Sequence, residues 1–238
     1  MTVDNLIQTA LAEVGYLEKN SPVNLDSKTA GAGSGNYTKY ARDMYPLCPS
    51  VYANGYAWCD TFVDWCMVRT FGAAKAKCLI HDWSAYTPTS AAYYKNVGQW
   101  HTSPKIGDQV FFKNQSGTIC HTGLVYKVDS DYVYTVEGNT SSESGVVANG
   151  GAVAKKKYRL GYSRIAGYGR PKYEDEEENE MKENVYNWTL ACPEWSQKYV
   201  QKALDLGLIK GDEKGYLNLT DTKIWCLVVT LRATGAMK

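Results

Sequence analysis

Two residues of this 238-residue chain, Cys59 and His121, could act together as a nucleophile and its base. Cys59 lies in the run Trp58-Cys59-Asp60-Thr61-Phe62, where we expect a helix to begin. At the first turn of a helix, unpaired backbone N–H groups and the helix dipole stabilise a thiolate. The same N–H groups can hold the oxyanion that forms when a thiolate attacks an amide carbonyl. The alternative is a small buried cysteine that only fills the core.

A hairpin would bring further polar groups to His121. If residues 129–131 form its turn, His121 lies opposite Asn139, and Glu137 lies opposite Gly123. Residues two apart on a strand share a face, so the side chains of His121, Glu137 and Asn139 would converge. A turn of another length would break this register.

This group of residues has the chemistry of a cysteine amidase. His121 would take the proton of Cys59 and later give it to the leaving amine. Either Glu137 or Asn139 would fix the orientation of the imidazole ring. The alternative is a structural histidine beside a solvent-facing carboxylate.

The composition describes a globular protein without the features of a nucleic-acid binder or a membrane protein. Hydrophobic residues make up 44% of the chain, charged residues 21%, and the net charge is +1, without the basic excess of nucleic-acid binders. No apolar run reaches the roughly 18 residues that a membrane span needs. Since the first residues do not resemble a signal peptide, we expect a protein made in the cytoplasm.

The seven cysteines do not form a recognisable disulfide or zinc pattern. Their odd number and the lack of a Cys-x-x-Cys pair argue against a disulfide framework and a structural zinc site. Cys78 and His81 could share a metal, but two further ligands at the usual spacing are missing. We expect no cofactor.

The pattern along the chain predicts an α+β domain over residues 1–172. Apolar residues at helical spacing follow Thr2, a plausible N-cap, and a second helix should begin near Cys59. From Gly107 onwards, alternating β-branched and aromatic residues predict strands of an antiparallel sheet. Helices followed by strands favour an α+β fold over alternating β-α-β units.

A small second domain should follow an acidic linker. Residues 173–183 contain a block of like charges that cannot bury anything, which is typical of a linker. In residues 184–238, helices are expected over Trp195–Leu208 and Ile224–Leu231. A unit this small has a marginal core of its own.

Several segments together resemble the CHAP family, papain-like amidases and peptidases of bacteriophage endolysins and bacterial autolysins. In family order, they are residues 56–66, 107–112, 121–125, 136–140 and 167–171. The resemblance implies a papain-like fold in which Cys59, His121, Glu137 and Asn139 carry catalysis. Some family members bind calcium just before the nucleophile, but residues 51–56 contain no carboxylate, so we expect no calcium there.

The residues after the linker resemble one S-layer homology repeat, a module that docks proteins on Gram-positive cell walls. The match departs at residues 220–223, where the usual start of the last helix is missing. The implied wall-binding residues are Trp195, Tyr199, Lys210, Asp212 and Tyr216. The alternative is a helical dimerisation or stabilising module. Because such repeats normally stack, we expect homo-oligomers through residues 184–238, with free modules if translation also starts at Met181.

The resemblance implies hydrolysis of an amide bond in Gram-positive peptidoglycan, with possible binding of a secondary wall polymer. We favour an N-acetylmuramoyl-L-alanine amidase over a cross-link endopeptidase. A non-catalytic wall-binding protein and a cytosolic protease are the alternatives from other classes. The residues expected to line the groove are Tyr56, Trp58, Trp83 and Trp100, although Trp83 fits the core equally well. A wall-directed enzyme without a signal peptide fits an endolysin that waits in the host bacterial cytoplasm until it is released onto the wall.

Overall fold

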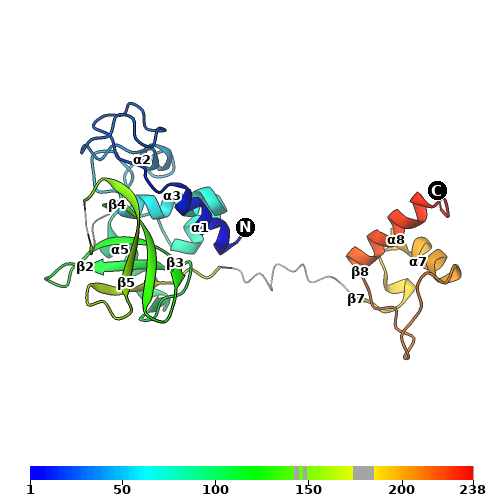
Figure 1. Ribbon diagram of the computed structural model, residues 1–238. Helices are drawn as coiled ribbons and strands as arrows, with labels where there is room; N and C mark the ends of the chain where they lie inside the picture. Colours follow the sequence, from blue (N-terminus) through cyan, green and yellow to red (C-terminus); the bar gives the residue numbers. More distant parts are fainter. Residues whose placement is uncertain (142–144, 147–148, 174–184, 238) are drawn as a thin grey trace. The chain divides into compact units, whose positions relative to one another are not determined.

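The computed structural model describes residues 1–141, 145–146, 149–173 and 185–237. The chain divides into two compact units, Met1–Tyr173 and Glu174–Lys238 (Figure 1). Apart from Tyr173, the expected acidic linker lies outside the described residues, as does Met181. Within the described ranges, none of the helices has the length and apolarity needed to cross a membrane.

The first unit is built on a six-stranded antiparallel sheet with the strand order β1-β6-β2-β3-β4-β5. The strands are β1 (Trp100–His101), β2 (Gln109–Lys113), β3 (Ile119–Val128), β4 (Tyr132–Thr140), β5 (Ala152–Arg159) and β6 (Ile165–Gly169). Strands β3 and β4 carry the residues of the expected hairpin, and both are interior strands of this sheet.

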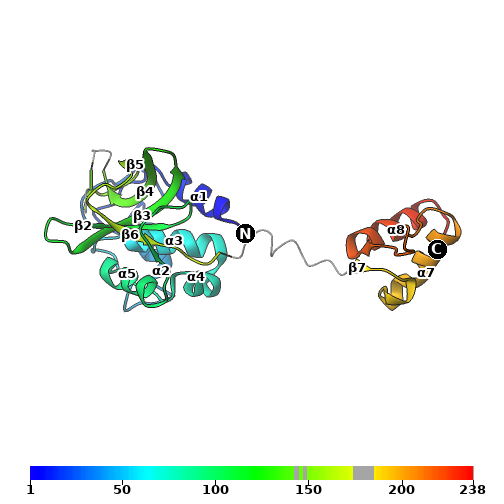
Figure 2. The same ribbon diagram turned by 90° about the horizontal axis from the view of Figure 1, so that it is seen from below.

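In the described part of this unit, five helices accompany the sheet (Figure 2). They are α1 (Val3–Ala12), α2 (Lys39–Met44), α3 (Cys59–Phe71), α4 (Ala73–Ile80) and α5 (Thr87–Asn96). Helix α3 packs against β3 and β4, while α5 packs against β3 and β6. The fold is therefore α+β, as the sequence predicted.

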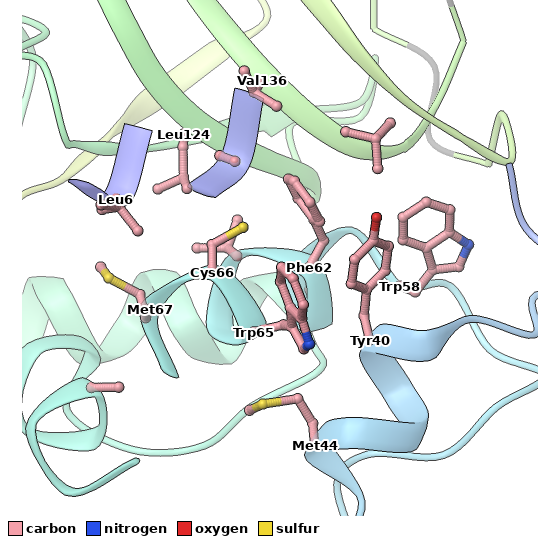
Figure 3. Close-up of a cluster of buried hydrophobic side chains, with 14 of the residues drawn as sticks. Leu6, Tyr40, Met44, Trp58, Phe62, Trp65, Cys66, Met67, Leu124 and Val136 are labelled. Atoms are coloured by element: carbon pink, nitrogen blue, oxygen red, sulfur yellow. The ribbon is translucent and has the colours of Figure 1, made fainter. Parts of the chain in front are cut away.

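Helix α3 is the central helix of this unit. Its residues from Cys59 to Met67 are all buried, so it lacks the single apolar stripe of a surface helix. Figure 3 shows Phe62 and Cys66 of α3 beside Leu124 and Val136 of the sheet, in one core cluster. The start of α3 is thus held firmly against the strands of the hairpin.

The hairpin register agrees with the expectation at two pairs in the middle of the hairpin but not at the turn. Leu124 pairs with Val136 and Val125 with Thr135, as expected, whereas nearer the turn Val128 pairs with Val133. The Asp129 N–H donates to the Tyr132 carbonyl over 3.0 Å, which closes a tighter turn than predicted. A β-bulge between Val125 and Lys127 adds one residue to β3 and restores the register.

The second unit contains more strand than the sequence suggested. Besides the helices α7 (Glu194–Asp205) and α8 (Asp221–Ala233), it has a short 3-10 helix, Thr189–Ala191, and a two-stranded ribbon. The ribbon pairs β7 (Val185–Tyr186) with β8 (Leu219–Thr220). Side chains of α7 and α8, among them Val200, Ala203, Val228 and Leu231, form two small clusters.

Candidate active site

Cys59 is the first residue of α3, in the position that the sequence predicted. The preceding residue, Trp58, is the N-cap, and its side chain makes no capping hydrogen bond. The first helical bond joins the Phe62 N–H to the Trp58 carbonyl over 2.9 Å. The backbone N–H groups before Phe62 are therefore not used by the helix itself, and only 5% of Cys59 is exposed.

His121 and Glu137 form a buried pair on neighbouring strands. His121 Nε2 lies 2.9 Å from Glu137 Oε2, and neither side chain is exposed. His121 Nδ1 has no hydrogen-bond partner among the described residues. The interaction with Glu137 therefore uses one ring nitrogen and leaves the other available.

Glu137 is held by two residues that sequence reasoning missed. The Thr135 hydroxyl donates to Glu137 Oε1 over 2.5 Å, and the Tyr158 hydroxyl donates to Oε2 over 3.3 Å. Burial, and then the charge and hydrogen bond of Glu137, raise the pKa of Tyr158, which keeps it a donor. Thr135 lies two positions before Glu137, so strand periodicity could have identified it. Tyr158 comes from β5, and no local pattern pointed to it.

His121 is strongly biased towards its charged form. Burial lowers the pKa of His121, but contacts with Cys59 and Glu137 outweigh it and raise the pKa to about 10. The ring thus interacts with the candidate nucleophile on one side and the carboxylate on the other. At neutral pH this arrangement favours an imidazolium between two acidic groups.

Asn139 lies two residues after Glu137 on β4, and among the described residues it makes no hydrogen bond with His121. It has a φ of 53°, so the backbone leaves the extended conformation and the expected alternation of side chains ends there. Its Oδ1 accepts a long hydrogen bond from the Gly151 N–H at 3.4 Å. Its Nδ2 is buried without a hydrogen-bond partner in the described part of the chain. Of the two alternatives, Glu137 is the residue that contacts the imidazole.

The prediction that Trp58 lines a substrate groove is wrong. Only 1% of Trp58 is exposed, and its indole packs against Tyr40 with ring centroids 5.4 Å apart. Its Nε1 donates to Glu18 Oε2 over 2.8 Å. The indole therefore belongs to the core beneath the start of α3 (Figure 3).

The other three aromatic candidates differ in their surroundings. Tyr56 is 71% exposed and lies three residues before Cys59. Trp83 is partly buried and packs edge-on against Tyr52, which matches its alternative assignment to the core. Trp100 packs against Phe111 in a separate cluster with α5. Tyr56 is the one of the three that combines exposure with proximity in sequence to the candidate nucleophile, Cys59.

The five wall-binding candidates of the second unit do not all reach its surface. Tyr199 is 2% exposed, so its assignment as a contact residue is wrong; its hydroxyl accepts hydrogen bonds from Arg232. The Asp212 carboxylate accepts N–H groups of its own loop. Lys210 is exposed.

Two exposed aromatic pairs remain on the second unit. Trp195 lies 4.8 Å from Trp225, centroid to centroid, and the two are 46% and 58% exposed. Tyr216 packs edge-on against Trp188, with ring centroids 5.4 Å apart. The sequence analysis did not predict Trp225 and Trp188 as contact residues, although tryptophan side chains suit sugar surfaces and could have indicated this role.

Among the described residues, no group of three or more His, Cys, Asp or Glu side chains is placed to hold a metal ion. The seven cysteines are all free thiols.

Comparison with known families identifies the segment that holds these side chains. Residues 51–139 match the model of the CHAP domain. The matched segment runs from just before α3 to the next-to-last residue of β4, and it contains Cys59, His121, Glu137 and Asn139. The match to a CHAP domain supports the assignment of the protein as a hydrolase that acts on peptidoglycan. No curated protein matches the chain.

Similar solved structures include two proteins. One is Ly7917, with 13% identity, a TM-score of 0.42, and coverage of 72% of this chain and 62% of that one. The other is the wild-type endolysin LysIME-EF1, with 15% identity, a TM-score of 0.41, and coverage of 92% and 89%. The chain spans less than two thirds of Ly7917.

Proposed function

We propose that the first unit hydrolyses an amide bond of bacterial peptidoglycan with Cys59 as nucleophile. The observation that carries this proposal is the placement of His121, which interacts with Cys59 and lies 2.9 Å from Glu137 in a fully buried pair. A surface histidine or a solvated carboxylate would not have these partners. The match of residues 51–139 to the CHAP domain supports the choice of substrate.

The reaction would proceed through an acyl-enzyme. The Cys59 thiolate attacks the amide carbonyl, and the unpaired N–H groups at the start of α3 stabilise the resulting oxyanion. His121 gives its proton to the leaving amine as the carbon–nitrogen bond breaks, which leaves a thioester on Cys59. His121 then takes a proton from water, and the hydroxide attacks the thioester. The carbon–sulfur bond breaks and the acid product leaves, which restores the Cys59 thiolate beside the protonated His121. Glu137 holds the imidazole ring and balances its charge.

We favour N-acetylmuramoyl-L-alanine amidase as the specific activity, with cross-link endopeptidase as the second candidate. The nucleophile chemistry is the same for both, so the shape of the groove selects the bond. Mass spectrometry of fragments released from purified Gram-positive walls separates them. Intact stem peptides free of glycan support the amidase, whereas shortened or uncrosslinked peptides still attached to sugar identify the endopeptidase. Release of neither product, under conditions where the protein is folded, contradicts both activities.

The second unit is proposed to attach the enzyme to the wall, including secondary wall polymers. The exposed rings of Trp195 and Trp225 support this role because aromatic faces suit sugar surfaces. Several chains could associate through residues 184–238, with added modules started at Met181. Untagged expression tests the internal start: a single full-length band on a denaturing gel contradicts it. We propose that the protein is an endolysin that acts on the wall after release from the host cytoplasm.

A further inference from the structure

Asp60, the residue after the candidate nucleophile, is a buried carboxylate that the proposed chemistry does not use. It is fully buried in the first turn of α3. Its strongest neighbours are neutral: the Ser90 hydroxyl donates to Oδ2 over 2.5 Å, and Gln109 Nε2 donates to Oδ1 over 2.9 Å. Among the described residues, no ion pair involves Asp60. A buried acid held only by neutral donors is costly, so its presence here needs a reason.

The hydrogen bonds of Asp60 lead to the strand that carries the base. Gln109 Nε2 also donates to Thr122 Oγ1 over 3.2 Å, and Thr122 directly follows His121. The Thr122 hydroxyl in turn donates to the Val110 carbonyl over 2.7 Å. Gln109 is 1% exposed and Thr122 is fully buried, so water does not compete for these bonds.

The chain Asp60–Gln109–Thr122 therefore joins the residue after Cys59 to the residue after His121. We propose that Asp60 and Gln109 are positioning residues whose hydrogen bonds fix the start of α3 against β3, and with it the Cys59 sulfur against the His121 ring. Misplacement of reacting groups by about 1 Å can cost roughly 100-fold in rate, so a bond that fixes this spacing has a large effect. The inference rests on the proposed roles of Cys59 and His121.

Asp60 can keep this contact in either protonation state. Burial raises the pKa of Asp60 to about 7, although the hydrogen bonds of Ser90 and Gln109 and the charge of His121 lower it. A protonated Asp60 still has an oxygen that accepts from Gln109, and its hydroxyl can donate to Ser90. An asparagine at this position has the same capacity.

Asp64 provides a matched control on the same helix. It is 3% exposed, and the Tyr52 hydroxyl donates to its Oδ2 over 2.5 Å. Burial and the charge of Asp60 raise the pKa of Asp64 well above its usual range. Asp64 lies one helical turn beyond Asp60 and takes no part in the chain to Thr122. Asp64→Asn therefore makes the same Asp-to-Asn change at a buried position of α3, but it leaves the hydrogen bonds of the chain Asp60–Gln109–Thr122 in place.

The test measures the alkylation rate of Cys59 by iodoacetamide in the full-length protein, with the exposed Cys78 as an internal reference. Mass spectrometry reads both cysteines in the same sample, and near-UV circular dichroism confirms that each variant is folded. We expect Gln109→Met to lower the alkylation rate of Cys59, relative to that of Cys78, at least about fivefold. Asp60→Ala should lower this rate at least as much. Asp60→Asn, which can still accept from Gln109, and Asp64→Asn should stay within about twofold of wild type.

A double variant separates positioning from general loss of stability. Because both residues act through one connection, Asp60→Ala combined with Gln109→Met should react no more slowly than Asp60→Ala alone. In assays of wall hydrolysis, Asp60→Ala and Gln109→Met should lower kcat and leave KM within about twofold of the wild-type value. Wild-type reactivity in folded Gln109→Met, or rate losses that multiply in the double variant, would overturn the proposal. If wild-type Cys59 itself is no more reactive than Cys78 and walls are not hydrolysed, the proposed function fails instead.

Discussion

His121 Nε2 and Glu137 Oε2 lie 2.9 Å apart in a pair that solvent does not reach. The imidazole uses this nitrogen for the carboxylate, which leaves Nδ1 for the nucleophile. The contact assigns the orienting role to Glu137 in the proposed mechanism, because Asn139 makes no such bond within the described residues.

Glu137→Gln should lower kcat for wall hydrolysis by about 100-fold or more. The amide keeps the shape of the side chain but removes the charge that balances the imidazolium, and loss of an orienting carboxylate can cost up to roughly 10⁴-fold. Steady-state rates on purified walls measure the effect. Asn139→Gln changes a polar residue on the same strand. It should lower the pKa of His121 less than Glu137→Gln does, because the charge of Glu137 raises this pKa. Equal activity of Glu137→Gln and wild type would remove Glu137 from the mechanism.

Gly123→Ala should damage the site although it changes no catalytic residue. A Cβ at Gly123 would lie 2.5 Å from Glu137 Cγ and 2.8 Å from the Val136 carbonyl oxygen, so the glutamate side chain and the strand that carries it must shift. We expect a loss of kcat of at least about tenfold, because the misplaced carboxylate no longer orients the ring. An unchanged rate in the folded variant would mean that Glu137 tolerates displacement.

The pH dependence of stability follows from the raised pKa of His121. Its folded-state pKa is about 10 and its ordinary value is 6.5, so the folded protein holds the proton more tightly. The stabilisation is complete below pH 6.5 and is lost as pH rises through 10. Denaturant unfolding at intervals from pH 6 to 10.5 should show a falling free energy of unfolding. In His121→Gln this dependence should be weaker; an equally steep fall would assign it to other groups.

The exposed tryptophan pair of the second unit should contribute to wall binding. In a Cys59→Ala background, which prevents digestion, we expect Trp195→Ala and Trp225→Ala each to weaken binding at least about fivefold. Co-sedimentation with purified walls measures it. Leu190→Ala is the control, since Leu190 is 85% exposed in the same unit but belongs to neither aromatic pair. If all three variants bind alike, the tryptophan pair is not the binding surface.

The sequence predicted the fold class and the placement of Cys59 because those depend on local patterns. The apolar spacing of α1, its cap at Thr2 and the start of α3 are local, and the structure has them where they were expected. The alternating residues of β3 and β4 likewise marked the two strands.

The features that the sequence did not predict depend on contacts between distant segments. The bulge in β3 that corrects the hairpin register has no composition signal of its own. Trp58 was assigned to the groove because exposure cannot be read from residue type, and its burial follows from packing against α2 and from the bond to Glu18. Tyr158 contacts Glu137 from β5, a strand that the sequence analysis did not predict. Lysines at its exposed positions alternate with buried residues.

The most direct test of the account is the digestion of purified Gram-positive walls by wild type, Cys59→Ala and Cys66→Ala. Cys66 is also a buried cysteine of α3, but burial raises its pKa well above the usual range and it lies in the core cluster. The account predicts that wild type and Cys66→Ala release peptidoglycan fragments, whereas folded Cys59→Ala releases none above background. Equal release by Cys59→Ala and wild type would show that Cys59 is not the nucleophile.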